Sequence, residues 1–413
     1  MRWSRIGVFI TAAALPAYVV RGHLGGLPFT GLEVVLGLTV LAFILESGVQ
    51  NRLPRVDTPF SVIAAVLLVA MVIAIADSPD RRAALGIAKD YVIEPLLLFY
   101  VAVNALRSSW DWERLAYGLY VAGAVVAVSQ FVALGQAVHA HTLNLSTVPP
   151  VPTWLWSNNN FGGILLDPLV ALALGLALFG GVRHPRVHWA ALCLLGLGDV
   201  LTLSRGSWLA LVVIAVVAAA LHPRRRLLLA GCVVAVLVAV ALPPIRHRIS
   251  NELNPNDPAN SLVTRAHLWH ATLDLIEAHP FTGSGLAGFQ REIGPYRARV
   301  HDTAAQTHNY PDQLELDFWV ELGVLGFVAL LGFFLELVRY LLPALRAGPR
   351  DHPWAAALAL SWIAIVVHGL LDSPYWKNDL AAEWWLLAAL VVVAVVPASR
   401  HLRLPRRAPE RAA

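Results

Sequence analysis

Long apolar runs separated by short polar connectors dominate the chain and predict a bundle of hydrophobic helices. Runs of about 16 to 22 residues approach the length that a helix needs to cross a hydrocarbon core of about 30 Å. They do not alternate as the strands of a membrane barrel would, so the predicted fold is all-α with about twelve transmembrane helices. We expect spans near residues 5–20, 31–49, 60–76, 91–106, 115–135, 161–181, 189–203, 207–221, 227–243, 312–341, 354–371 and 382–397.

One polar segment, between the ninth and tenth runs, is much longer than the other connectors. It divides the chain into spans 1 to 9 (1–244), a loop (245–311), spans 10 to 12 (312–399) and a basic tail (400–413). The loop is rich in Arg, His and aromatic residues. Within it, apolar positions recur at helical spacing up to His279-Pro280, and they predict a helix with one apolar side. The residues of that side are Leu268, Trp269, Thr272, Leu275 and Ile276.

Composition supports a polytopic membrane protein, because 57% of the residues are apolar and only 14% are charged. The net charge of +4 comes largely from arginines in short connectors, which fix orientation rather than bind nucleic acid. These connectors share one side with both termini, so the positive-inside rule places the termini in the cytoplasm and the loop outside. Cys193 and Cys232 lie in apolar runs and indicate neither a disulfide framework nor a metal cluster.

Arg205 lies in the sequence Ser204-Arg205-Gly206-Ser207, between two apolar runs. A charged side chain at such a depth usually faces a polar cavity, pairs with a partner or binds an anion. The alternative is that Arg205 extends its side chain to the outer interface. Gly206 and Ser207 are small enough to let a ligand or a neighbouring helix approach the backbone.

The loop carries two further candidate features. Arg265 and Trp269 are four residues apart and therefore share a face of the predicted helix. Gly283-Ser284-Gly285 follows the helix, and its backbone N–H groups could approach an oxyanion. The same three residues could equally form an ordinary turn.

His308 precedes a well-marked helix start, in which Asn309 or Tyr310 can cap and Pro311 suits the first position. From residue 312 to residue 341 that helix would measure about 45 Å, longer than the hydrocarbon core. Its first turns should therefore project above the outer surface or tilt along it, which would place His308 just above the membrane. An imidazole there is a suitable proton acceptor for a sugar hydroxyl.

These motifs, taken together, resemble the O-antigen ligase and O-antigen polymerase superfamily of bacterial membrane enzymes. The resemblance rests on Ser204-Arg205-Gly206, on Arg265-x3-Trp269 leading to Pro280-x2-Gly283-x-Gly285-x3-Phe289, and on Thr307-His308-Asn309-Tyr310 followed by Glu321-Leu322-Gly323. It implies an inverting glycosyltransferase that needs neither a metal nor a cofactor. The enzyme would transfer a glycan from undecaprenyl diphosphate to an acceptor hydroxyl.

The resemblance also implies roles for single residues. His308 matches the histidine that acts as base on the acceptor hydroxyl or positions it, and Asn309 and Trp269 are candidates for positioning the acceptor. Arg205 and Arg265 match arginines that engage the donor diphosphate, where Arg82 or Lys89 would join them. The chain has Gln306-Thr307 where family members often carry a second histidine, which leaves the proton chemistry on the acceptor side less defined.

Several functions remain open at this point. A ligase would use an acceptor such as lipid A-core at the periplasmic face of the bacterial inner membrane. A polymerase would extend another lipid-linked glycan, and a protein O-oligosaccharyltransferase would modify a protein. Outside the enzymes, part of the superfamily has been labelled as bicarbonate carriers. A small-anion transporter should show charged or broken segments near the bilayer midplane, whereas the polar residues here are expected at the outer surface.

Overall fold

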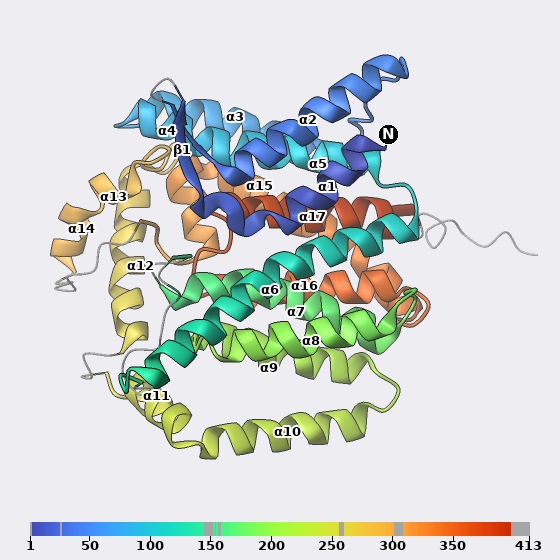
Figure 1. The fold of residues 1–413 in the computed structure, drawn as a ribbon. Helices are drawn as coiled ribbons and strands as arrows, with labels where there is room; N and C mark the ends of the chain where they lie inside the picture. Colours follow the sequence, from blue (N-terminus) through green and yellow to red (C-terminus); the bar gives the residue numbers. More distant parts are fainter. Residues whose placement is uncertain are drawn as a thin grey trace, which may run out of the picture.

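The computed structural model describes residues 2–24, 27–143, 152, 154–155, 158–255, 260–300 and 309–397, which form a bundle of long helices (Figure 1). A helix lies at each position where an apolar run predicts one. These are α1 (Trp3–Ala13) with η1 (Leu15–Val19), α2 (Gly31–Val49), α3 (Ser61–Asp77), η2 (Ala88–Ile93) with α5 (Glu94–Ala105), α6 (Ser109–His139), α7 (Asn159–Phe179), α8 (Pro185–Val200), α9 (Arg205–Leu221), α10 (Arg225–Ala241), α15 (Leu314–Ala347), α16 (Pro353–Gly369) and α17 (Asn378–Leu390) with η3 (Val391–Val395).

Within the described residues, 5 helices are long and apolar enough to cross a membrane, or 6 if the bent pair of α10 and α11 (Pro243–Leu253) forms one span. The helices α3, α9 and α16 are also apolar but have 17 residues each. The prediction of a mostly helical chain with several helices able to cross a membrane is therefore confirmed. The number of twelve spans and the side on which each connector lies remain predictions.

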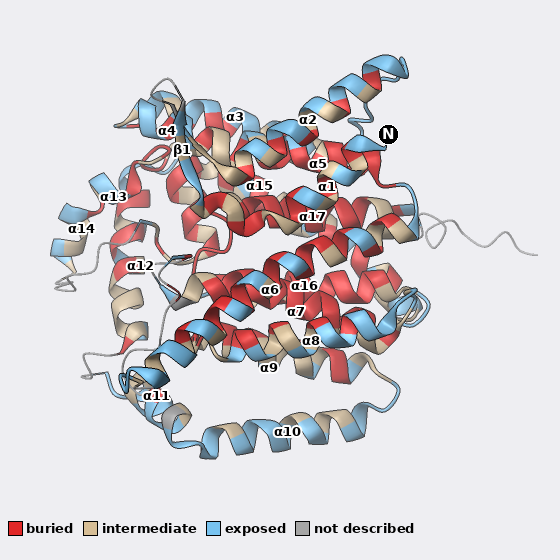
Figure 2. Cartoon of the chain, in the orientation of Figure 1, coloured by how far each residue is buried: buried red, intermediate tan, exposed pale blue. Residues whose placement is uncertain are grey.

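The centre of the bundle is formed by helices that are buried on nearly every side (Figure 2). In the most apolar part of α7, 78% of the residues are buried, against 28% in α2 at the edge. Gly175 allows α7 to approach α16 closely, because a Cβ atom there would lie 2.4 Å from Cα of Ala357. By contrast, α10 has no buried residue among those that the structure describes.

A short hairpin, which the apolar pattern does not predict, follows the first helix. The strands β1 (Arg21–Leu24) and β2 (Leu27–Thr30) pair antiparallel, with Arg21 opposite Thr30. Thr30 then starts α2: its hydroxyl accepts a hydrogen bond from the Glu33 N–H at 3.2 Å, and the Glu33 carboxylate accepts one from the Thr30 N–H at 3.1 Å. This capping box fixes the start of the helix.

The helix predicted over residues 312–341 is present as α15, but it is interrupted at Gly323. The backbone there has φ 68° and ψ −169°, a combination that is essentially restricted to glycine. The segment around residues 280–286 packs into the break. Ser284 donates its N–H to the Val320 carbonyl at 2.8 Å, and Val324 donates to the Phe281 carbonyl at 3.2 Å.

The loop between the ninth and tenth predicted spans is helical, with α11, α12 (Ser261–Ala278), α13 (Phe289–Glu292) and α14 (Gly294–Arg299). In Figure 1, α12 runs across the left end of the bundle, whereas the N-terminus lies at the right. Its predicted apolar side is buried: Leu268, Leu275 and Ile276 pack with Phe289 and Val320 in a second apolar cluster. The loop helix is thereby fixed to α15.

Candidate active site

Arg265 lies in the second turn of α12, and its guanidinium group is directed toward the loop that joins α16 to α17. Asn260 caps the start of α12, because its side-chain oxygen accepts hydrogen bonds from the N–H groups of Leu262 and Val263. The Arg265 Nε atom donates to the Leu371 carbonyl at 2.6 Å, and Nη2 lies 3.3 Å from both carboxylate oxygens of Asp372. The side chain is only 13% exposed. Arg265 therefore joins the loop helix to the bundle.

Asp372 is the centre of a network that links four elements. Asn160, at the start of α7, donates to both of its carboxylate oxygens at 3.1 Å. His368, on the last turn of α16, places Nε2 at 3.3 Å from one of them. Burial alone would raise the pKa of the Asp372 carboxyl, but the His368 ring, the Arg265 guanidinium and the Asn160 amide outweigh it and keep the pKa below its usual value. Asp372 is thus held as an anion.

Arg205 is the first residue of α9, at the end of the bundle where α12 lies. Ser204 caps this helix by accepting a hydrogen bond from the Ser207 N–H. The Arg205 guanidinium forms an ion pair with Glu252 on α11. Glu252 also accepts hydrogen bonds from the Ser261 hydroxyl at 3.2 Å and the Leu262 N–H at 3.1 Å. One carboxylate therefore connects Arg205 to the start of α12.

A third arginine, Arg248 on α11, completes an arginine cluster, which we define as Arg205, Arg248 and Arg265. Arg248 is 8% exposed and donates from Nη1 to the Leu203 carbonyl at 3.1 Å. Its burial lowers the pKa of the guanidinium, since a charged group is less stable away from water. Arg205 lies close enough to Arg248 and Arg265 for the three positive charges to repel one another. Such a concentration of guanidinium groups favours an anionic ligand.

The turn at residues 283–285 is structural, and the oxyanion interpretation of its N–H groups is not supported. The Gly283 N–H donates to the His279 carbonyl at 2.9 Å and the Ser284 N–H to the Val320 carbonyl at 2.8 Å. Gly283 has φ +65°, and a Cβ atom there would lie 2.2 Å from the Val320 oxygen. The glycine serves close packing against α15, which leaves these two amides no room for a ligand.

The small residues after Arg205 also serve helix packing. A Cβ atom on Gly206 would lie 2.6 Å from Nε2 of His368. Ser207, the next residue, is completely buried and lies against Gly163 of α7. Of the two possibilities that the sequence left open, a ligand or a neighbouring helix, the structure therefore shows the helix.

The acceptor-side residues are only partly within the described chain. The predicted base His308 lies outside the described residues, which resume at Asn309. Asn309 is exposed, and the next residue, Tyr310, stacks on Trp376 with ring centroids 5.8 Å apart. Trp269 of α12 donates from its indole N–H to the Pro311 carbonyl at 3.1 Å. This bond ties the chain that follows His308 to the same helix that carries Arg265.

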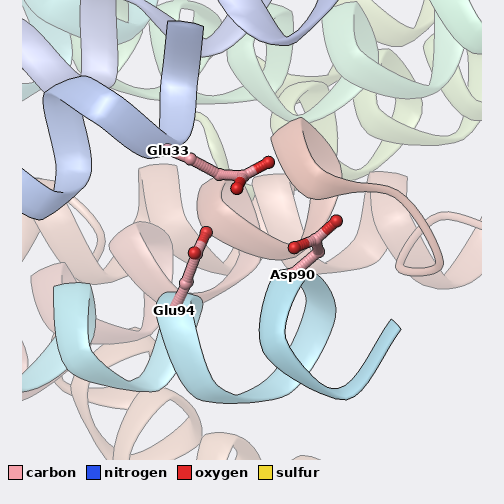
Figure 3. A group of neighbouring side chains, drawn as sticks. All are labelled: Glu33, Asp90 and Glu94. Carbon is pink, nitrogen blue, oxygen red and sulfur yellow. The ribbon is translucent and has the colours of Figure 1, made fainter. Parts of the chain in front are cut away.

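Arg82 and Lys89, which the resemblance associates with the donor, lie on a different part of the molecule. Arg82 is exposed on α4 (Arg81–Ile87). The Lys89 ammonium lies 2.5 Å from a Glu33 oxygen and 3.0 Å from an Asp90 oxygen. Figure 3 shows Glu33, Asp90 and Glu94 directed toward one another, with ligand atoms within 4.8 Å of each other. Lys89 forms ion pairs with these acidic neighbours and not with the ligands of the arginine cluster.

Asp372, Asn160 and Arg248 are members of the site that the sequence motifs did not select. Asp372 begins a short polar break, Asp372-Ser373-Pro374, between two apolar runs, and an acid in such a break often has a buried cationic partner. Arg248 lies in the loop but belongs to none of the motifs that carry the resemblance. Neither residue falls in a motif with a recognisable spacing, so the three-dimensional contacts were needed to find them.

Fold and site together define a multi-pass helical membrane protein with an arginine cluster beneath a loop helix. Residues 189–331 match the family model described as O-antigen ligase, which supports the superfamily that the sequence motifs indicate. The match supports a function of the O-antigen ligase or polymerase type and, with it, an enzyme that acts on lipid-linked glycans in a membrane. No curated protein matches the chain.

Proposed function

We propose that the protein is an inverting, metal-independent glycosyltransferase of the O-antigen ligase type. It transfers a glycan from undecaprenyl diphosphate to an acceptor hydroxyl, with lipid A-core as the expected acceptor, and releases undecaprenyl diphosphate. The active site faces the periplasm, at the outer surface of the inner membrane. Transfer to a growing glycan or to a protein are the alternatives within the same chemistry.

The observation that carries the proposal is the convergence of Arg205, Arg248 and Arg265 from three helices at one end of the bundle. Two acids, Glu252 and Asp372, pair with Arg205 and Arg265, so the cluster already binds carboxylate groups and is suited to another anion. A diphosphate has the charge and the oxygen geometry that such forks bind in pairs.

The role of the arginine cluster in the reaction follows from the leaving group, which is the lipid diphosphate. As the glycosidic bond to the diphosphate breaks, negative charge develops on the diphosphate oxygens, and positioned guanidinium groups stabilise that charge. On the other side of the sugar, the acceptor hydroxyl must lose a proton, for which His308 is the proposed base. Attack from the face opposite the diphosphate inverts the configuration of the sugar carbon.

A small-anion transporter is less well supported than an enzyme. However, the expectation that the polar residues lie at the outer surface was wrong. Polar residues are not confined to the outer surface, because Asp167, Asp199 and Glu383 are buried within the bundle. These three groups are acidic, so none of them supplies the positive charge that would bind bicarbonate. The family match also favours the enzyme.

The direct test is a transfer assay with purified full-length protein in detergent or vesicles. Undecaprenyl-diphosphate glycan is supplied with three acceptors in parallel: lipid A-core, a second lipid-linked glycan and an unfolded protein rich in serine. We expect glycan on lipid A-core, and we expect transfer to continue in excess EDTA. Glycan on another acceptor would replace the ligase assignment with the corresponding alternative.

The control is the variant Arg265→Ala, which removes the guanidinium group. Because alanine is a strong helix former, helix α12 should be retained. We expect this variant to insert into the membrane and to transfer no glycan. If the wild-type protein leaves all three acceptors unmodified while it transports bicarbonate into vesicles, the enzyme proposal fails.

A further inference from the structure

Behind Asp372, a line of buried ionisable side chains continues into the bundle, and the proposed reaction does not use it. His368 of α16 is 1% exposed, and Asp167 of α7 and Asp199 of α8 are completely buried. Ionisable groups inside a membrane protein are expensive and usually have a function or a specific partner. Each of these three groups therefore needs an explanation.

His368 lies between two carboxylates. Its Nδ1 atom contacts the Asp167 carboxylate at hydrogen-bonding distance, and its Nε2 atom lies 3.3 Å from Oδ2 of Asp372. The backbone of Gly206 closes one side of the ring, so the ring has little freedom to turn away. An imidazole can direct a hydrogen at both carboxylates only when both of its nitrogens are protonated.

The charges of the buried side chains His368, Asp167 and Asp199 balance when both ring nitrogens of His368 are protonated. Asp199 lies against Asp167, and two carboxyl groups so close in a dry interior share one proton instead of ionising together. The pair then has one negative charge, which the imidazolium compensates. Asp372 is compensated by Arg265. A neutral ring would instead leave the Asp167–Asp199 pair without a cationic contact among the described residues, at a cost of several kcal/mol.

We propose that His368, protonated on both ring nitrogens and held by Asp167, is a positioning residue that keeps Asp372 in place as the partner of Arg265. The inference rests on the proposed function. A diphosphate that binds Arg265 competes with Asp372 for the guanidinium. The contact from His368 Nε2 then holds the Asp372 carboxylate in place, so that Arg265 can bind the donor without leaving Asp372 without a hydrogen-bond partner.

The charge state of His368 depends on every ionisable group that faces it. Two carboxylates contact the ring directly, Asp167 of α7 and Asp372 in the loop after α16. Other ionisable groups lie behind these two: Asp199 of α8 and Glu383 of α17 beside Asp167, Arg205 of α9 and Arg265 of α12 beside Asp372, and Asp317 of α15 beside Ser373. The two carboxylates in direct contact favour the protonated ring.

The charge state can be measured without any transfer activity. Full-length protein with ¹⁵N-labelled histidine is purified in detergent micelles, and its spectrum is compared with that of His368→Gln to assign the ring nitrogens. We expect both nitrogens of His368 to carry a proton at about pH 7, where a free histidine is mostly neutral. A neutral tautomer at that pH would overturn the proposal.

The positioning role is tested by the dependence of transfer on pH. The His368→Gln variant should lose about 10-fold or more in kcat/KM, as is typical for the removal of a supporting hydrogen-bond partner. Its profile should also lack the decline on the alkaline side that deprotonation of His368 causes in the wild type. The matched control is His352→Gln, because His352 precedes the first residue of the same helix at its other end; that profile should equal the wild type.

The double variant His368→Gln, Asp167→Asn separates this role from a merely structural one. It removes the cation together with the carboxylate that needs it, so we expect it to recover thermal stability lost in His368→Gln but not the transfer rate. An unchanged pH profile at a uniformly lower rate in His368→Gln would reduce His368 to a structural residue. A wild-type protein that transfers no glycan would refute the proposed function instead, while the nitrogen spectrum would still decide the charge state.

Discussion

At the scale of single residues, Arg265 shows how the protein holds a guanidinium ready for an anion. One edge of the group is fixed by the Leu371 carbonyl at 2.6 Å, and the other faces Asp372 at 3.3 Å. The shorter contact is to a backbone oxygen, and it fixes the orientation of the guanidinium group. The longer contact is to a carboxylate, which a diphosphate can replace. Arg265 is therefore oriented before the donor arrives.

This arrangement predicts that Arg265→Lys will impair transfer severely, although it keeps the charge. A lysine ammonium cannot contact the Leu371 carbonyl and a diphosphate as a planar fork does. We expect kcat to fall by about 100-fold, the usual loss when one donor to a developing anion is removed. The measurement is the steady-state transfer rate with lipid-linked glycan.

The matched control for that substitution is Arg291→Lys in the same loop. Arg291 also pairs with an aspartate, Asp80, but its side chain is 58% exposed, and exposed ion pairs contribute little. Its rate should stay within about twofold of the wild type. Equal losses in the two variants would mean that Arg265 acts only through the stability of the loop.

The sequence motifs could identify Arg265 and Arg205, but not the acids that hold them. An arginine in an apolar context is unusual enough to stand out in one dimension. Its partner can come from any element, and Asp372 lies more than 100 positions after Arg265 in the chain. The same holds for Lys89, whose acidic partners Glu33 and Asp90 the motifs did not indicate, and its contact with the donor stays a prediction.

At the scale of elements, two glycines determine how the loop joins the membrane helices. Gly283 and Gly323 each lie where a Cβ atom would collide with a backbone oxygen, at 2.2 Å and 2.1 Å. The collisions are reciprocal, because Gly283 faces Val320 and Gly323 faces Phe281. The turn at residues 283–285 and the break in α15 therefore pack directly against each other, and each leaves space for the backbone of the other.

We predict that Gly323→Ala destabilises the protein by about 2 kcal/mol or more, since alanine must adopt a backbone region essentially restricted to glycine and also avoid the Phe281 oxygen. The measurement is the thermal unfolding midpoint in detergent, followed by transfer activity. Loss of the junction should also lower activity, because α12 would no longer be held against α15.

Gly294→Ala is the control for that prediction, because Gly294 starts α14 in open space, with no atom within 4 Å of an added Cβ. We expect a change within about 0.5 kcal/mol, as for an ordinary surface substitution. A Gly323→Ala variant as stable as Gly294→Ala would show that the break in α15 does not depend on glycine.

The apolar runs were sufficient to place the helices of the bundle, since an apolar segment of that length has few other stable structures. They could not predict the break at Gly323, because it results from the packing of a segment about 40 residues earlier. The hairpin of β1 and β2 was missed for a related reason. Its strands have four residues each, too few for an alternating pattern to appear.

At the scale of the whole molecule, the arrangement agrees with the topology that the arginine distribution predicts. The loop helix α12 and the N-terminus lie at opposite ends of the bundle (Figure 1). If the loop faces the periplasm, as proposed, the connector around Leu53 must face the cytoplasm. Leu53 is 97% exposed, and Leu253 at the end of α11 is 78% exposed. These two leucines are therefore suitable reporters for the two sides.

We predict that a cysteine at Leu253, but not one at Leu53, reacts with a membrane-impermeant maleimide in intact spheroplasts. Both substitutions are made in a background of Cys193→Ala and Cys232→Ala, because these are the two cysteines of the chain. After the membrane is opened with detergent, both positions should react, which shows that each thiol is accessible. Because short connectors rich in arginine remain in the cytoplasm, reaction at Leu53 from outside would invert the topology. It would also move the arginine cluster to the side where no periplasmic acceptor could reach it.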